Sequence, residues 1–346
     1  MNLQDLLQKS LLALLLLPTL ILAADRVGDF SLLDQNGYFH QMSWYDDNKA
    51  IVLLVQATGD IGVQNVLADF DSLNSSFDAQ GIEFFMINPL GLKDRDAVKA
   101  EMVALNIDVP VLMDDARLIS EALDIDKIGE VIVYDPKSFS VLFRGPLGAE
   151  LTTALTNIVA DRDLQTTQVA STGTPVNYPI KTAHLQQVPS YEKEIGPIIA
   201  QNCAACHREG GIAPFALDSH TMVMGWSQMI REVLMTKRMP PGQIDSHIGD
   251  FINDMVLVDE DAQKIVHWIE AGSPKDGITD PLTALVWPET EWAFGEPDYI
   301  VEIPEQSIPA TGILDYYNVM VELDLEEDRW VRASQYIPGD RTVLHH

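Results

Sequence analysis

The sequence holds only two cysteines, and both stand in one box, Cys203-Ala204-Ala205-Cys206-His207. One pair of cysteines cannot provide a disulfide framework for a chain of 346 residues, so the cores must form by apolar packing. A C-x-x-C-H box is the pattern that covalent haem attachment requires, because two thiols bond to the porphyrin and the histidine binds the iron. We therefore expect Cys203 and Cys206 to hold haem c, with His207 as an axial ligand.

Two other interpretations of the box are a thiol–disulfide redox pair and half of a zinc site. A redox pair is expected at the start of a helix that follows a strand, whereas Tyr191–Ala200, before the box, has a helical pattern. A zinc site needs four ligands, and the sequence has no second pair of cysteines. Haem attachment is therefore the favoured interpretation.

The iron needs a second axial ligand, and Met239 is the candidate. It stands in the segment Lys237-Arg238-Met239-Pro240-Pro241-Gly242, whose prolines stiffen the loop that would present a weakly binding thioether. The alternatives are an open site, another sulfur or a second imidazole. The residues that could supply these are Met222, Met224, Met235, Met255, His220 and His247.

The chain is strongly acidic, with 52 Asp and Glu against 22 Lys and Arg and a formal charge of −30. Such a surface repels nucleic acid and anionic membranes, so neither is expected as a partner. The hydrophobic content of 47% is enough for packed cores. Redox proteins are the partners that a haem protein of this kind predicts.

Residues 1–24 have the pattern of an export signal. Lys9 precedes an apolar run from Leu11 to Leu22, and Ala23-Ala24 offers a cleavage site. The run is shorter than the ~20 residues that span a bilayer, so we expect cleavage, with a retained membrane anchor as the alternative. Export to the periplasm or beyond agrees with haem attachment, which takes place outside the bacterial cytoplasm.

Residues 25–164 predict an α/β domain. Apolar runs typical of buried strands occur at 51–55 and 82–87, and two more at 130–134 and 140–143 flank a turn sequence. Helical patterns lie between and after them, through Phe77 and at 95–105, 117–123 and 151–160. A βαβ unit, a helix, a hairpin and a final helix form an α/β layer.

This domain resembles the thioredoxin-like redoxin family through Gly28-Asp29-Phe30, its hairpin and Met113-Asp114-Asp115. The resemblance implies a nucleophilic cysteine after the first central strand, but Asp60 stands there and the domain has no cysteine at all. Ile128-Gly129-Glu130 also replaces the family's usual proline. Asp60 is better interpreted as a helix N-cap, and the domain as a scaffold or docking module.

Residues 165–188 are expected to be a linker, and 189–279 an all-α domain. This second domain resembles a compact cytochrome c domain of exported bacterial proteins. The landmarks are the cysteine box, Gly210–Pro214, Arg238–Pro241 and Trp268–Pro274. The resemblance implies haem on Cys203 and Cys206, and iron held by His207 and Met239.

Residues 280–346 show β alternation at 298–304 and 317–323 and end with His345-His346. They resemble the opening of a copper type II monooxygenase of the peptidylglycine-hydroxylase type, which implies the beginning of a β-sandwich. By that resemblance His345 and His346 are candidate copper ligands. The other ligands of that family are missing, so we expect a truncated domain; the alternative for the histidine pair is a tag remnant.

These observations predict a multidomain exported c-type cytochrome that transfers electrons through one covalent haem. By the order of its domains, the haem would relay electrons to a copper monooxygenase domain that the chain only begins. Two alternatives remain open: a fragment of a copper-dependent monooxygenase, and a docking or assembly protein built on the redoxin-like domain.

Overall fold

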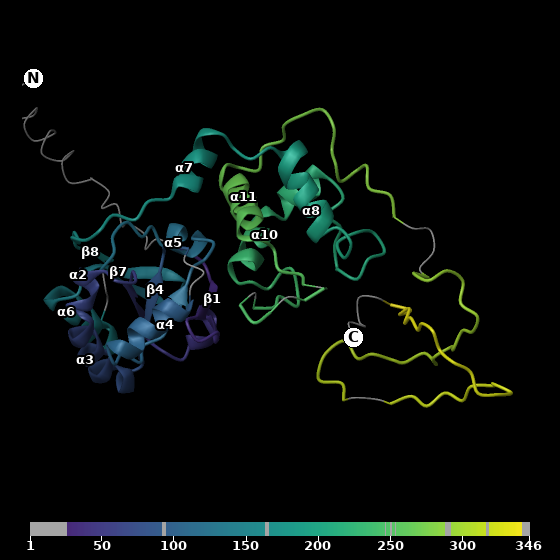
Figure 1. The fold of residues 1–346 in the computed structure, drawn as a ribbon, viewed down its shortest axis with the longest axis horizontal. Helices are drawn as coiled ribbons and strands as arrows, with labels where there is room; N and C mark the ends of the chain where they lie inside the picture. Colours follow the sequence, from purple (N-terminus) through teal and green to yellow (C-terminus); the bar gives the residue numbers. More distant parts are fainter. Residues whose placement is uncertain are drawn as a thin grey trace, which may run out of the picture. The chain divides into compact units, whose positions relative to one another are not determined.

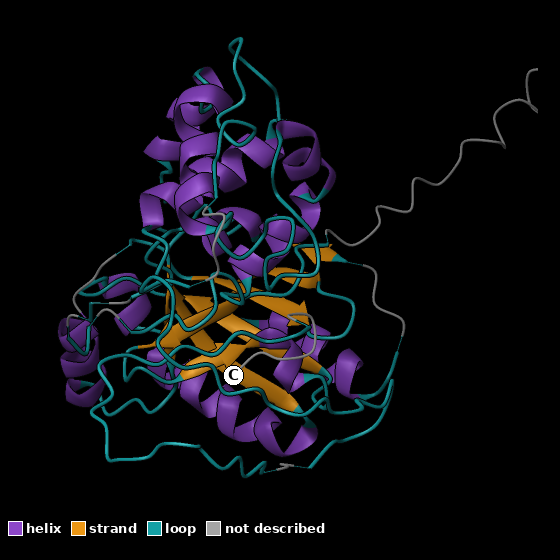
Figure 2. Ribbon diagram, turned by 90° about the vertical axis from the view of Figure 1, so that its right-hand side faces the viewer, coloured by secondary structure: helices purple, strands orange, loops and turns teal. Residues whose placement is uncertain are grey.

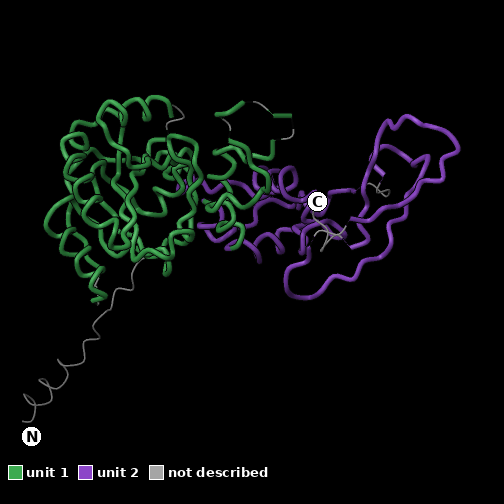
Figure 3. The backbone as a smooth tube through the Cα atoms, turned by 90° about the horizontal axis from the view of Figure 1, so that it is seen from below, with its two compact units in different colours: residues 1–183, 229–266 green, residues 184–228, 267–346 purple. Residues whose placement is uncertain are grey.

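The computed structural model describes residues 26–91, 95–162, 166–245, 247–249, 251–252, 254–287, 292–315 and 318–340. The expected signal segment and the pair His345-His346 lie outside the described residues. The chain divides into two compact units, which Figure 3 shows in different colours. Unit 1 comprises residues 1–183 and 229–266, and unit 2 comprises residues 184–228 and 267–346.

Unit 1 is built on one mixed sheet of eight strands, in the order β2-β1-β5-β4-β3-β6-β7-β8. The central strands β3, β4 and β5 are parallel, whereas β6 pairs antiparallel with both β3 and β7. In Figure 2 the strands form one layer with helices against it. The strands are β1 (Ser31–Asp34), β2 (Phe39–Gln41), β3 (Ala50–Val55), β4 (Ile82–Asn88), β5 (Val111–Met113), β6 (Glu130–Asp135), β7 (Ser140–Pro146) and β8 (Thr167–Gln168).

Helices connect and cover this sheet (Figure 1). All six residues of β3 are buried, as its continuous apolar run predicts, and the expected βαβ unit, helix, hairpin and final helix are all present. A thioredoxin-like α/β domain therefore covers part of the chain. The helices are α2 (Ile61–Gln64), α3 (Leu67–Phe77), α4 (Arg95–Ala104), α5 (Leu118–Ala122), α6 (Ala149–Val159) and α7 (Pro179–Gln186), with single turns η1 (Met42–Tyr45) and η2 (Asp78–Gln80).

The segment expected to be a linker differs from that expectation, because much of it pairs with the α/β domain. Strand β8 lies parallel to β7. Further along, the N–H of Ile128 donates to the carbonyl of Thr174, and the N–H of Val176 donates to the carbonyl of Asp126, both at 2.9 Å. Strand β8 satisfies backbone groups at the edge of the sheet, and residues 174–176 pair with the loop before β6, although neither segment has a strand pattern in its sequence.

Residues 229–266 also belong to unit 1, although the sequence assigns them to the haem domain. They include most of α10 (Ser227–Met235) and α11 (Asp259–Glu270). Met235 and Val266 are 3% and 1% exposed and belong to the same apolar core as the sheet. Both helices are amphipathic, and the partly buried Leu234 and Ala262 pack against the same core.

Unit 2 contains the π-helical turn η3 (Tyr191–Ile195), α8 (Gly196–Asn202) and α9 (His220–Gly225). The helix expected over 191–200 is thus present, and Trp226 separates α9 from α10. The described residues between 189 and 279 form helices and turns without a strand.

The described residues 292–315 and 318–340 contain no strand, so the expected β-sandwich stays a prediction. Their alternating apolar side chains, such as Ile300, Ile303 and Met320, are exposed. Alternation produces a strand only where a neighbouring strand accepts its hydrogen bonds. Among the described residues, no helix is both long and apolar enough to cross a membrane.

Candidate functional site

The cysteine box follows the C-terminal end of α8. The helical segment begins at Ser190, whose side chain accepts a hydrogen bond from the N–H of Lys193 at 3.1 Å, an N-cap. At the other end, the N–H of Cys203 donates to the carbonyl of Ile199 at 2.9 Å. The carbonyl of Cys203 then accepts from the N–H of His207, also at 2.9 Å, and closes the box into a tight turn.

Both thiols of the box are free and half-buried. Burial, with a smaller contribution from Cys206, raises the pKa of the Cys203 thiol to about 12. A thiol that exchanges disulfides needs the opposite shift, which the N-terminus of a helix supplies and the C-terminus opposes. Burial therefore keeps the Cys203 thiol protonated in the haem-free chain, and its place after the C-terminal end of α8 offers no helix N-terminus to oppose this.

The imidazole of His207 is oriented by a backbone carbonyl. Nδ1 lies 3.1 Å from the carbonyl oxygen of Phe215, which can only accept, so Nδ1 carries the proton. The Phe215 ring lies 4.6 Å from the imidazole and stacks on Trp226 at 4.1 Å. Burial lowers the pKa of His207, although the bond to Phe215 opposes this. No described residue bonds to Nε2, so a neutral ring presents a lone pair suited to iron.

Two glycines allow the chain to return across the box. Gly210 has a φ of +68°, a backbone conformation that disfavours side chains. A Cβ on Gly211 would lie 2.3 Å from the carbonyl oxygen of Cys206. The returning strand of backbone is held by the N–H of Leu217, which donates to the carbonyl of His207 at 2.8 Å. The sequence motif Gly-Gly after the box therefore has a steric reason.

The candidate ligand His220 lies in the aromatic core of unit 2. Its ring lies 4.6 Å from Tyr191 and 5.9 Å from Trp268, both fully buried. Its Nε2 bonds to the carbonyl of Ser273 at 3.0 Å and is therefore the protonated nitrogen. Asp280 joins the cluster by accepting from the Tyr191 hydroxyl at 2.6 Å. His220 is a core residue here, and this disfavours its alternative role as a ligand.

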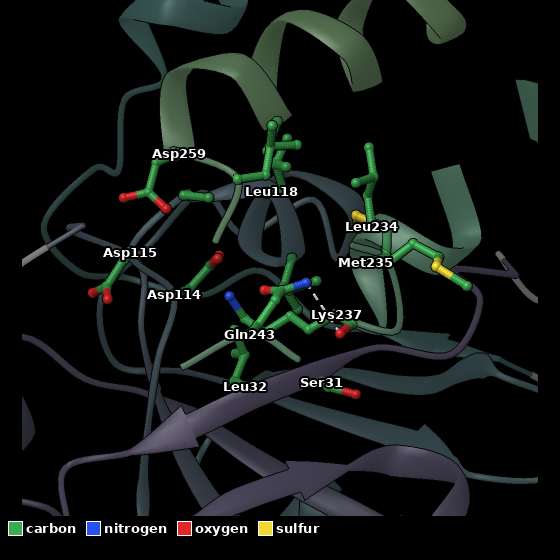
Figure 4. Close-up of a pocket in the computed structure, with 15 residues that line it drawn as sticks. Ser31, Leu32, Asp114, Asp115, Leu118, Leu234, Met235, Lys237, Gln243 and Asp259 are labelled. Carbon is green, nitrogen blue, oxygen red and sulfur yellow. Dashed lines mark hydrogen bonds between the residues drawn. The ribbon is translucent and has the colours of Figure 1, made fainter. Parts of the chain in front are cut away.

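Met239 belongs to unit 1 and is 38% exposed. It lines a small cavity of about 50 Å³, shown in Figure 4, together with residues of the α/β domain such as Leu32 and Asp114. Burial raises the pKa of Asp114 to about 6 against its hydrogen bonds from Ser120. His207 and Met239 belong to different units, so their pairing at one iron stays a prediction.

The other expected ligand candidates are accounted for in part. Met235 is buried in the core of unit 1, and His247 bonds to the carboxylate of Asp245 at 3.1 Å. Met224 and Met255 are exposed. Sequence reasoning did not single out Phe215, although its place right after Ala213-Pro214, within reach of the box, was the available signal.

Asp60 is confirmed as an N-cap, since its carboxylate accepts from the N–H of Val63 at 3.0 Å. Its other oxygen accepts from the hydroxyl of Thr174 at 3.1 Å. The turn borders a groove of about 790 Å³ within unit 1, lined partly by residues 172–175. Within the described ranges, no three His, Cys, Asp or Glu side chains are grouped as metal ligands would be.

No protein-family model and no curated protein matches the chain. Similar solved structures exist for part of it. A hypothetical protein from Sinorhizobium meliloti 1021 is 19% identical, with 45% of this chain and 93% of that one covered and a TM-score of 0.41. A peroxidoxin from Mycobacterium tuberculosis is 20% identical, with 40% and 97% covered and a TM-score of 0.34. A thioredoxin-family thiol:disulfide interchange protein from Chlorobium tepidum TLS is 19% identical, with 40% and 97% covered and a TM-score of 0.34.

Proposed function

We propose that the chain is an exported c-type cytochrome that transfers electrons through one covalent haem. The observation that carries the proposal is the orientation of His207. Its Nδ1–H is bound to the Phe215 carbonyl, which directs the lone pair to Nε2 and leaves it without a partner among the described residues. A proximal ligand to haem iron requires this tautomer.

The haem, when bound, supplies reversible one-electron chemistry at its iron. The chain's own residues would hold and tune it. Cys203 and Cys206 would form the two thioether bonds, and His207 would bind the iron from a fixed ring position. Met239 would supply a soft thioether, a ligand type that raises the reduction potential.

Thiol–disulfide exchange is the competing chemistry for the same box, and two features oppose it. The box follows the C-terminal end of α8, where the helix dipole disfavours a thiolate. Burial also raises the pKa of Cys203. An exchange nucleophile would sit at the N-terminal end of a helix, as Asp60 does in the α/β domain.

The relay to a copper domain is the narrower part of the proposal and rests on the resemblance of residues 280–346. A monooxygenase activity would need a complete copper domain, with redox proteins as partners. The relay would be overturned if a protein with a complete, copper-loaded domain failed to reoxidise its reduced haem under oxygen.

The test is to export the chain in a bacterium that also produces the haem-attachment machinery, and to measure whether the purified chain carries covalent haem. The purified protein should show reduced c-type α and β bands, and the haem should stay with the polypeptide after acid–acetone extraction. The variants Cys203→Ser and Cys206→Ser should each lose a thioether bond, and the double variant should lose the haem. Ala205→Ser is the matched control, because it adds a hydroxyl at an exposed position of the same box.

The proposal fails if folded wild-type chain, matured in this way, carries no covalent haem. Formation of a reversible Cys203–Cys206 disulfide in that chain would then favour the thiol chemistry.

A further inference from the structure

The loop that carries Met239 lies between α10 and α11, and both of these helices contact the α/β domain of unit 1. Before the loop, Met235 at the end of α10 is 3% exposed in the core that includes the sheet. After it, Val266 of α11 is 1% exposed in the same core. The side-chain amide of Gln263 also donates to the carbonyl of Ala116, next to α5, at 2.7 Å. These contacts tie both flanking helices to one domain.

A half-buried ion pair holds the loop itself. The guanidinium of Arg95, at the start of α4, lies 2.7 Å from Oδ2 of Asp245. The two side chains are only 10% and 11% exposed. Burial alone would raise the pKa of Asp245, but hydrogen bonds from His247 and Arg95 outweigh it and keep the pKa below its ordinary value. A charge-assisted bond this well shielded is stronger than a surface pair.

The turn between β1 and β2 is shaped to admit this pair. Gly37 has a φ of +89°, and a Cβ there would lie 3.2 Å from Nη1 of Arg95 and 3.3 Å from Oδ2 of Asp245. A glycine is thus required twice, by the backbone conformation and by the close approach of two charged groups. The β1–β2 turn of the α/β domain therefore leaves room for the contact between Arg95 and Asp245.

The loop is closed next to Met239 by one side chain. The amide of Gln243 donates to the carbonyls of Lys237 and Pro240, both at 3.1 Å; the first of these bonds is drawn in Figure 4. Met239 lies within this closed segment and lines the small cavity with Ser31 of β1. The position of its thioether therefore depends on the α/β domain.

We infer that the cysteine-free α/β domain positions the axial-ligand loop, with Arg95 and Asp245 as its positioning residues. This inference rests on the proposed function, because it gives the domain a role only if Met239 binds haem iron. A thioether binds iron weakly, so a ligand loop gains from being preorganised. The domain would then act through packing and one ion pair, without any thiol.

The test compares Asp245→Asn with Glu232→Gln in the full chain. Both remove one negative charge from residues 229–266, but Glu232 pairs with Arg238 in an exposed contact, 58% exposed on each side. In the haem-loaded protein, Asp245→Asn should weaken the long-wavelength sulfur-to-iron band and lower the midpoint potential. Asp245→Glu, which keeps the charge, should restore part of both, and Glu232→Gln should change neither.

A second readout needs no haem. Full chain made without haem is treated with hydrogen peroxide, and sulfoxide formation at Met239 is followed by peptide mass spectrometry. Met224, which is 45% exposed in unit 2, is the internal reference. Loss of one partner leaves the other charge of this shielded pair uncompensated and loosens the loop, so Asp245→Asn should raise the Met239 rate about twofold relative to Met224. Circular dichroism checks that the variant is folded.

The two proposals fail in different ways. Wild-type chain without covalent haem overturns the proposed function and this inference with it. Wild-type chain with covalent haem but without the sulfur-to-iron band overturns this inference and the Met239 ligand, while the covalent cytochrome stands. The inference also fails if Asp245→Asn keeps the band, the potential and the Met239 oxidation rate of Glu232→Gln.

Discussion

Each unit has a turn next to a helix end, but the turn in unit 1 precedes a helix N-terminus and the turn in unit 2 follows a helix C-terminus. In unit 1 the turn after β3 leads into the N-terminus of α2, where a thiol would be activated, and Asp60 occupies the place. In unit 2 the turn after the C-terminus of α8 holds both cysteines, where a thiolate is disfavoured. The difference teaches that both cysteines of this chain lie at a helix end that disfavours thiol–disulfide exchange.

The largest expected effect is a difference in how acid and base act on the two units. Asp114 of unit 1 is buried, and burial raises its pKa from 3.8 to about 6. Burial also opposes ionisation of Asp280 in unit 2, but hydrogen bonds from His220 and Tyr191 outweigh it and lower that pKa. Between pH 4 and 6 the Asp114 carboxyl holds its proton in the folded protein but has lost it in the unfolded chain. Unit 1 therefore loses stability as pH rises through this window. The contribution of Asp280 to the stability of unit 2 is present above pH 3.8, its ordinary pKa, and is lost as pH falls below that value.

At 1.36 kcal/mol for each pKa unit, the loss from Asp114 amounts to roughly 3 kcal/mol. Urea unfolding of wild type and Asp114→Asn at pH 4 to 7 measures it, and the variant should show a flatter profile. Asp280→Asn should flatten the dependence only below pH 4. An unchanged profile in Asp114→Asn would remove this contrast.

The next effect concerns the steric demands of the two turns. A Cβ on Gly211 meets a backbone carbonyl at 2.3 Å, whereas one on Gly62 in α2 meets only the movable side chain of Asp60 at 3.0 Å. Gly211→Ala should therefore cost about 2–3 kcal/mol of unfolding free energy, while Gly62→Ala should cost little. Thermal unfolding of both variants checks this, and equal costs would contradict the steric account.

A smaller effect is expected for the cap. Asp60→Ala removes the acceptor of the Val63 N–H and should cost about 1 kcal/mol of unfolding free energy. Asp60→Asn keeps an acceptor oxygen and should cost only part of that. Denaturant titration of the three proteins is the measurement, and an Asp60→Asn variant weaker than Asp60→Ala would argue against the cap.

The smallest change tests the contrast directly through reactivity. Asp60→Cys places a thiol at the N-terminus of α2, so its alkylation rate at neutral pH should exceed that of Cys203 in the haem-free chain. The stability cost should be no greater than that of Asp60→Ala. A slower reaction at position 60 than at 203 would show that helix ends do not govern the two turns.

Long apolar runs predict much of the sheet, because a strand buried on both faces needs apolar residues throughout, as 51–55 and 82–87 show. The strands β1, β2 and β5 have only four, three and three residues, too few for a period to emerge. Pairing with neighbouring strands defines them instead, since β1 lies between β2 and β5, and β5 lies between β1 and β4. The same holds for β8, in a segment whose composition is typical of a linker.

The sequence by itself determined the box, its order Cys-x-x-Cys-His and the absence of cysteine from the α/β domain, because these are matters of residue identity and spacing. Only the tertiary structure decided which nitrogen of His207 is committed to Phe215, that His220 lies in an aromatic core, and that the Met239 loop is held by Arg95 and Asp245. The physical reason is the same for all three. Hydrogen bonds and ion pairs between residues far apart in the chain depend on packing, which no local pattern records.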